Sequence, residues 1–150
     1  MRLVVQRVSS ASVTVDGEVV GSIAAGMLIL LGIAPEDTET DADWLVGKVS
    51  RLRIFDDENG VMNLSLLDTG KEALVVSQFT LMASYKKGNR PSYIRAAAPP
   101  VAIPLYEYFV RKLSETTSKE VPTGRFGADM KVSLVGDGPV TIVMDSKNPE

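Results

Sequence analysis

Apolar and polar side chains alternate in the first part of the chain, which is the pattern of β-strands that bury one face. The alternation predicts strands over residues 3–8 and 12–15, and Asp16-Gly17 predicts a hairpin turn after them. Residues 18–23 then return as the partner strand. The continuous apolar run over residues 27–33 predicts a strand that is buried on both faces.

Two later stretches change to the period of an α-helix. The first follows Thr38 and Thr40, either of which can cap a helix because an Asp stands three residues further on. Its apolar positions are Trp44, Leu45, Val49 and Leu52, and we expect the Trp44 ring to lie in the core. A second helix is expected to begin near Pro104, because the first helical turn tolerates proline. Its buried side is formed by Leu105, Phe109 and Leu113.

The apolar residues 74–76 predict a core strand that ends in Ser77-Gln78-Phe79-Thr80, and a loop follows over residues 82–94. Further strands are predicted over residues 53–55, 61–66, 120–121, 131–135 and 140–144. An acidic turn over residues 56–60 is better explained as solvated than as a metal site. We expect one α+β domain over residues 1–150, with mixed or antiparallel strands curled into a barrel-like sheet and two helices packed on it.

Composition places the chain among globular domains, since 45% of its 150 residues are hydrophobic and 23% are charged. No apolar run approaches the roughly 20 residues that a membrane span needs. The N-terminal residues alternate and do not form the apolar stretch of a signal peptide. We therefore expect a cytoplasmic protein without a membrane partner.

The chain contains no cysteine and no histidine. Thiolate nucleophiles, sulfur-ligated metals and a Ser-His-Asp triad are therefore excluded. No metal and no cofactor are expected. If the protein is an enzyme, its chemistry must come from backbone amides, from hydroxyls or from groups that the substrate brings.

Positive charge is concentrated after the predicted core strand, although the net charge is −3. Residues 73–106 contain no Asp or Glu, and the same stretch contains Lys86, Lys87, Arg90 and Arg95. A solvated basic loop would explain this pattern. A loop that attracts a phosphate-bearing ligand to the nearby Ser77-Gln78-Phe79-Thr80 segment would also explain it.

Two motifs together indicate a family. Ser77-Gln78-Phe79-Thr80 and Gly138-Pro139-Val140-Thr141 resemble motifs of the D-aminoacyl-tRNA deacylase family, and the resemblance extends to residues 1–8, 62–66 and 124–130. It implies the same α+β fold, a homodimer, and hydrolysis of the ester that joins a D-amino acid to the 3′ end of tRNA.

The resemblance also implies a cis peptide bond between Gly138 and Pro139. This pair would project from one subunit into the pocket of the other and reject L-amino acids by collision, so that glycyl esters, as on mischarged tRNA-Ala, would also be cleaved. Arg7 would hold the Gly-Pro carbonyls in orientation, and Phe126 and Met130 would line the pocket for the terminal adenosine. A surface arginine and ordinary core packing are the alternative explanations.

Ser77, Gln78, Phe79 and Thr80 are the candidate catalytic residues. A Thr80 nucleophile lacks a base, since the chain has no histidine. Hydrolysis assisted by the 2′-hydroxyl of the terminal ribose fits better, with the N–H groups of Phe79 and Thr80 stabilising the oxyanion.

The chain departs from the family pattern in carrying Gly136 where Asn is usual and Tyr93 where Phe is frequent. Two other functions stay open: a non-catalytic RNA-end binding module that uses Lys86, Lys87 and Arg90 as its tRNA contacts, and a hydrolase of small molecules.

Overall fold

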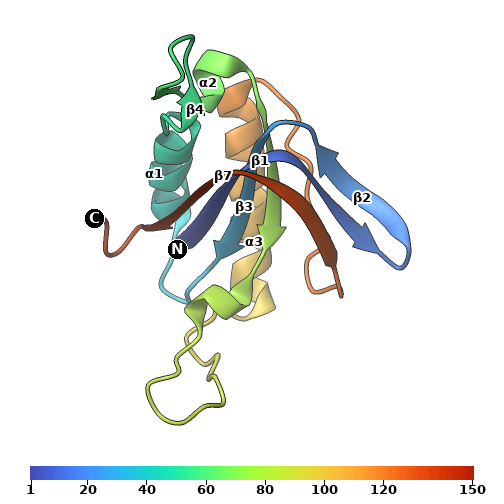
Figure 1. Cartoon of the computed structure of the whole chain (residues 1–150). Helices are drawn as coiled ribbons and strands as arrows, with labels where there is room; N and C mark the ends of the chain where they lie inside the picture. The colour runs from blue at the N-terminus through green and yellow to red at the C-terminus, as the bar shows by residue number, and fades with distance from the viewer.

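A long first strand organises the sheet in the computed structural model, which describes residues 1–150. β1 (Arg2–Val15) pairs antiparallel with β7 (Lys131–Asp145) along one edge. Its other edge pairs antiparallel with β3 (Gly26–Gly32) and then with β2 (Glu18–Ile23). Figure 1 shows β1 at the centre of this arrangement.

The sheet is mixed because β6 (Glu72–Ser77) runs parallel to β3. The register of β1 shifts against both β2 and β7, and such bulges increase the twist and bend a strand. A separate hairpin joins β4 (Phe55–Asp56) to β5 (Met62–Leu64). The expected α+β class with a curled, mixed sheet is confirmed.

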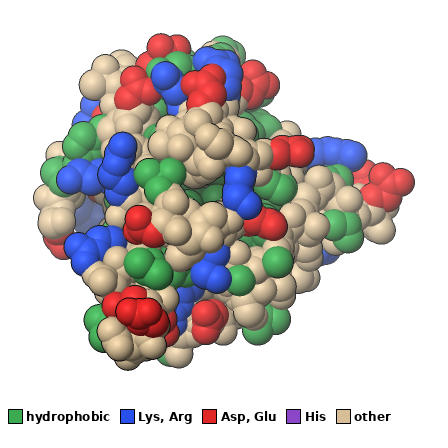
Figure 2. Space-filling view, turned by 90° about the horizontal axis from the view of Figure 1, so that it is seen from above, with side chains coloured by type: hydrophobic (Ala, Val, Ile, Leu, Met, Phe, Trp, Pro, Cys, Tyr) green, Lys and Arg blue, Asp and Glu red, His purple; other side chains and the backbone are tan.

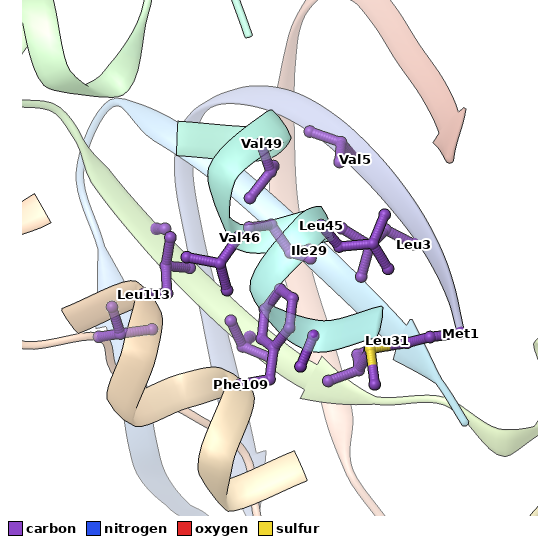
Figure 3. Packing of buried hydrophobic residues seen from close by; sticks show 14 of the residues in the cluster. Met1, Leu3, Val5, Ile29, Leu31, Leu45, Val46, Val49, Phe109 and Leu113 are labelled. Carbon is purple, nitrogen blue, oxygen red and sulfur yellow. The ribbon is translucent and has the colours of Figure 1, made fainter. Parts of the chain in front are cut away.

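α1 (Glu39–Ser50) and α3 (Pro99–Thr117) lie side by side and cover one face of the sheet (Figure 1). A short α2 (Leu66–Thr69) precedes β6, and a 3₁₀-helix, η1 (Phe79–Met82), follows it. The main core lies between the two long helices and the sheet. Figure 3 shows Leu45, Val46 and Val49 of α1 directed at Leu3 and Val5 of β1 and at Ile29 and Leu31 of β3, with Phe109 and Leu113 of α3 beside them.

Several predicted boundaries are correct. The Asp16-Gly17 turn has positive φ at both residues, as a two-residue hairpin turn requires, and β2 has the predicted bounds. Thr38 is the residue that caps α1, and its N–H donates to Asp41 Oδ2 at 2.9 Å. Leu105, Phe109 and Leu113 are buried as expected.

Five predictions of local structure are wrong. Residues 3–8 and 12–15 belong to a single strand, β1, and residues 131–135 and 140–144 belong to a single strand, β7. The two strands stay paired on both sides of the bulges that interrupt their register. Residues 120–121 are not a strand, although Thr123 forms a bridge with Val75. α3 begins at Pro99, because Pro99 and Pro100 occupy its first two positions, where no intrahelical N–H is needed.

Trp44 is the fifth error, because its side chain is not in the core. The residue is 39% exposed, and the Lys48 ammonium lies 5.5 Å from the centre of the ring. Sequence spacing places Trp44 on the apolar side of α1, at the edge of the buried stripe that contains Leu45 and Val49.

None of the helices combines the length and the apolar character that crossing a bilayer requires.

Candidate active site

The Ser77-Gln78-Phe79-Thr80 segment lies where the buried strand β6 ends and η1 begins. Leu74, Val75 and Val76 are almost fully buried, which fixes the end of the strand in place. The N–H of Gln78 donates to the Leu31 carbonyl of β3 at 2.8 Å, so the sheet also holds the first residue after the strand. The segment is therefore presented by rigid structure.

A cavity of about 290 Å³ opens beside this segment. Its lining includes Ser77, Gln78 and Phe79 together with Phe126 and Met130, which come from a distant part of the chain. The remaining wall is mostly apolar and comes from β3, β6, α3 and β7 and from the segments that flank them. The structure thus brings five of the predicted site residues together around one apolar cavity, which is the usual form of a small-ligand site.

Thr80 has a hydroxyl but no base beside it. It is not part of the cavity lining, and its Oγ1 accepts a hydrogen bond from the Gln78 side-chain amide. In η1 the Leu81 N–H donates to the Gln78 carbonyl at 3.2 Å. Phe79 and Thr80 come before Leu81 in the first turn of η1. The N–H groups of a first helical turn have no partner within the helix.

Tyr106 of α3 also lines the cavity, and sequence reasoning missed it. Its ring packs edge-to-face on Phe126 with centroids 5.8 Å apart, and its hydroxyl donates to the Val75 carbonyl at 3.4 Å. Burial raises the pKa of Tyr106, so the phenol stays protonated at neutral pH. The signal in the sequence was its place three residues before Phe109 on the buried face of a helix.

Phe79 and Tyr93 form an aromatic pair near the cavity, with centroids 5.1 Å apart in an edge-to-face arrangement. Phe79 is 54% exposed even though it lines the cavity, so part of its ring faces outward. Tyr93 retains the contact that a Phe would make at this position, because the pair uses the ring and not the hydroxyl.

A basic arm, residues 85–91, projects from the end of the molecule at which β6 ends and η1 begins (Figure 1). Ser84 and Ser92 close its base by exchanging two backbone hydrogen bonds of 2.8 Å. Lys86, Lys87 and Arg90 are exposed on the arm and form no ion pair. The opposite end of the molecule differs, since Figure 2 shows acidic and basic side chains interspersed there.

Gly138 and Pro139 lie in a Gly-Pro bulge, residues 137–140, within β7. The register passes from Gln6–Thr141 to Val8–Gly136, so the four residues 137, 138, 139 and 140 stand opposite Arg7 alone. The peptide bond between Gly138 and Pro139 is cis, as the resemblance implied. Both residues are exposed, and neither lines the cavity beside Ser77 in the same chain.

Arg7 holds this bulge against the sheet. Its Nε donates to the Asp137 carbonyl at 2.8 Å, and its Nη1 donates to the Ile54 carbonyl at 2.8 Å. The side chain is only 11% exposed, so it is not a free surface arginine. The sequence pointed to Arg7 through the resemblance alone, because its partners are 47 and 130 residues away along the chain.

Comparison with known proteins gives the chain its family. Residues 4–145 match the model of the family described as D-Tyr-tRNA(Tyr) deacylase. Proteins named D-aminoacyl-tRNA deacylase from Dechloromonas aromatica (strain RCB) and Bacteroides thetaiotaomicron are each 63% identical over 150 residues, covering 100% of both sequences. The chain belongs to the D-Tyr-tRNA(Tyr) deacylase family. The predicted family is therefore confirmed, and with it the predicted class of enzyme, a deacylase of aminoacyl-tRNA.

Two solved structures share the fold of this chain. The c-Myc DNA Unwinding Element Binding Protein superimposes with a TM-score of 0.91 at 42% identity, covering 97% of this chain and 98% of that one. A structure described as a probable eukaryotic D-amino acid tRNA deacylase superimposes with a TM-score of 0.83, covering 95% and 97%. Its 17% identity supports the shared fold alone.

A larger groove of about 1350 Å³ lies between α1 and the end of β7. It includes Trp44 and Arg2 but none of the residues that the motifs identify as site residues. The smaller cavity beside Ser77 is the better candidate for the site of the D-Tyr-tRNA(Tyr) deacylase reaction, because the motif residues converge there.

Proposed function

We propose that this protein hydrolyses the ester bond of D-aminoacyl-tRNA in the cytoplasm, releasing a D-amino acid and free tRNA. The observation that carries the proposal is the convergence of Ser77, Gln78 and Phe79 with Phe126 and Met130 around one cavity, in a chain of this family. The apolar wall suits the terminal adenosine. The basic arm lies at the same end of the molecule and suits the phosphates that precede it.

Selection between mirror-image substrates is assigned to the Gly-Pro bulge. The carbonyls of Gly138 and Pro139 and the proline ring form a surface without a flexible side chain. Arg7 bonds the Asp137 carbonyl of the bulge and the Ile54 carbonyl, which directly precedes β4. An L-substituent would collide with this surface, whereas a D-substituent would point away from it. Glycine has no substituent to reject, so glycyl esters, including glycyl-tRNA-Ala, should also be cleaved.

The bulge is proposed to act on the cavity of a second copy of the chain. It does not line the cavity of its own chain, so one copy alone lacks the selecting surface. β7 is an edge strand of 15 residues, and Val143, on the strand, is 70% exposed. Long apolar edge strands are normally paired or covered, and a homodimer would cover this one.

Hydrolysis is proposed to depend on backbone groups and on the substrate. The amides of Phe79 and Thr80 would stabilise the oxyanion, and the ribose 2′-hydroxyl would help water to attack the ester carbonyl. A Thr80 nucleophile is disfavoured because its hydroxyl bonds the Gln78 amide, which cannot accept a proton as a base does.

The test of shared sites is subunit mixing. The double variant Phe126→Ala/Met130→Ala should have a damaged cavity and an intact bulge. The variant Pro139→Ala should have an intact cavity and a damaged bulge. Dimers that contain one copy of each would restore one complete site, so mixing should recover selective hydrolysis of D-tyrosyl-tRNA. Mixed dimers that behave as the average of the two variants would contradict the shared site.

Turnover separates the proposed enzyme from its alternatives. An RNA-end binding module would bind charged tRNA and release it uncleaved. A small-molecule hydrolase would cleave free D-amino-acid esters as fast as the tRNA-linked ones. The proposal predicts cleavage that requires the tRNA.

A further inference from the structure

We infer that Asp56 is a positioning residue for the Gly-Pro bulge and acts on it through Arg7. The inference rests on the proposed function, since it assigns Asp56 to the selection step. Asp56 is the last residue of β4 and the first of the acidic stretch 56–60, for which the sequence suggested only solvation or a metal.

Arg7 connects the β4–β5 hairpin to the bulge. On the hairpin side, Nη1 donates to Asp56 Oδ1 at 3.2 Å and to the Ile54 carbonyl at 2.8 Å. On the bulge side, Nε donates to the Asp137 carbonyl at 2.8 Å. The guanidinium is planar, so fixing Nη1 on the hairpin also fixes the direction in which Nε points.

A competing carboxylate makes the contact with Asp56 important. The side chain of Asp137 is itself 3.5 Å from Arg7 Nε, and it is 59% exposed and free to move. Without Asp56, the Asp137 carboxylate would be the remaining charged partner of the guanidinium. Rotation toward it would weaken the bond to the Asp137 carbonyl, which is the contact that holds the bulge. Asp56 draws the guanidinium toward the hairpin and opposes that rotation.

The hairpin that carries Asp56 is itself well ordered by side-chain bonds. Asp57 Oδ1 accepts from the N–H groups of Asn59 and Val61 at 2.9 and 3.1 Å, and Oδ2 accepts from the Asn63 amide at 3.2 Å. The Asp57 N–H donates to the Val61 carbonyl at 2.8 Å. Asp56 is thus presented from a hairpin whose turn is held by bonds that do not involve Arg7.

The expected effect is small, because Asp56 is 52% exposed and water screens the pair. Half-exposed ion pairs of this kind change equilibria by about two- to fivefold. Asp56→Ala should therefore raise the rate on L-tyrosyl-tRNA about two- to fivefold, with the rate on D-tyrosyl-tRNA unchanged. Asp56→Asn, which keeps an acceptor oxygen, should have a smaller effect, and Asp56→Glu should restore part of the selectivity.

The matched control is Glu58→Ala, which removes a carboxylate from the same turn but has no contact with Arg7. It should leave the ratio of D to L rates unchanged. In an Arg7→Ala background, Asp56→Ala should have no further effect on that ratio. Exchange of the amide hydrogens of residues 136–138 and 140 should be faster in Asp56→Ala than in Glu58→Ala, and this measurement reports on the bulge without reference to activity.

Equal D-to-L ratios and equal exchange in Asp56→Ala and Glu58→Ala would overturn the inference. The inference would also be overturned if Asp56→Ala changed the ratio of D to L rates as much in the Arg7→Ala background as it does in wild type. Failure of the proposed function would be distinct, because wild-type protein itself would then cleave D- and L-tyrosyl-tRNA equally.

Discussion

Removal of the three arm cations should weaken tRNA binding in a way that depends on salt. Lys86, Lys87 and Arg90 are exposed and unpaired, and the arm around them carries no acidic residue. They are therefore free to contact phosphates. The variant Lys86→Ala/Lys87→Ala/Arg90→Ala leaves the Ser84–Ser92 bonds at the base of the arm in place.

The magnitude follows from counterion release. Each phosphate contact contributes roughly 0.7 to 0.9 to the slope of log affinity against log salt, so three contacts contribute about 2.1 to 2.7. Between about 50 and 200 mM salt, wild-type affinity should therefore fall about 20- to 40-fold more than that of the triple variant. Fluorescence anisotropy with labelled, uncharged tRNA at several salt concentrations measures both slopes.

The control is Arg111→Ala/Lys112→Ala/Lys119→Ala, which removes the same charge at and just beyond the C-terminal end of α3. That end lies opposite the arm (Figure 1). The control should keep nearly the wild-type slope. The assignment of the arm to phosphate binding would be refuted if wild type and the arm variant had equal slopes of log affinity against log salt. It would also be refuted if the arm variant and the control variant lowered that slope equally.

Three further results are expected. Thr80→Ala should keep substantial deacylase activity, whereas a 2′-deoxy terminal adenosine should abolish it; the reverse pattern would support a threonine nucleophile. Phe109→Ala should lower the free energy of unfolding by about 3–5 kcal/mol, measured by urea denaturation, because the ring is fully buried. Burial opposes ionisation of Asp41, but the Thr38 N–H and the Lys147 ammonium outweigh it and hold its pKa well below the ordinary value. Its contribution to stability is therefore present above the unfolded pKa of roughly 4 and is lost as the pH falls below that value. Asp41→Asn should lose less stability than wild type between neutral pH and pH 3, and an equal loss would contradict this reasoning.

Local patterns in the sequence were enough to predict most of the strands and both long helices. The Asp16-Gly17 turn defines β2, because only a few residue pairs accept positive φ at both positions. Periodicity was less informative about Trp44, because an apolar stripe does not show how far the neighbouring elements extend over it. The continuity of β1 and β7 was missed because bulges interrupt the alternation without ending the pairing.

The candidate site was predictable only where a motif was local. Ser77, Gln78 and Phe79 form one side of the cavity because they follow directly from a buried strand. Tyr106 joins them through helix packing: its spacing from Phe109 indicates burial, but not that α3 places it beside β6. The contact of Arg7 with Asp56 spans 49 residues and depends on how the hairpin docks on β1, so it became visible only in three dimensions.

The central claim is that the main chain of the Gly-Pro bulge, and not a reactive side chain, decides which esters are cleaved. Its most direct test is the rate of deacylation of matched D- and L-tyrosyl-tRNA by wild-type protein and by Pro139→Ala, in which the ring that fixes φ is lost. We expect wild type to cleave the D-ester and spare the L-ester, and Pro139→Ala to cleave the L-ester measurably faster than wild type does. Equal rates on both esters by wild-type protein would contradict the claim.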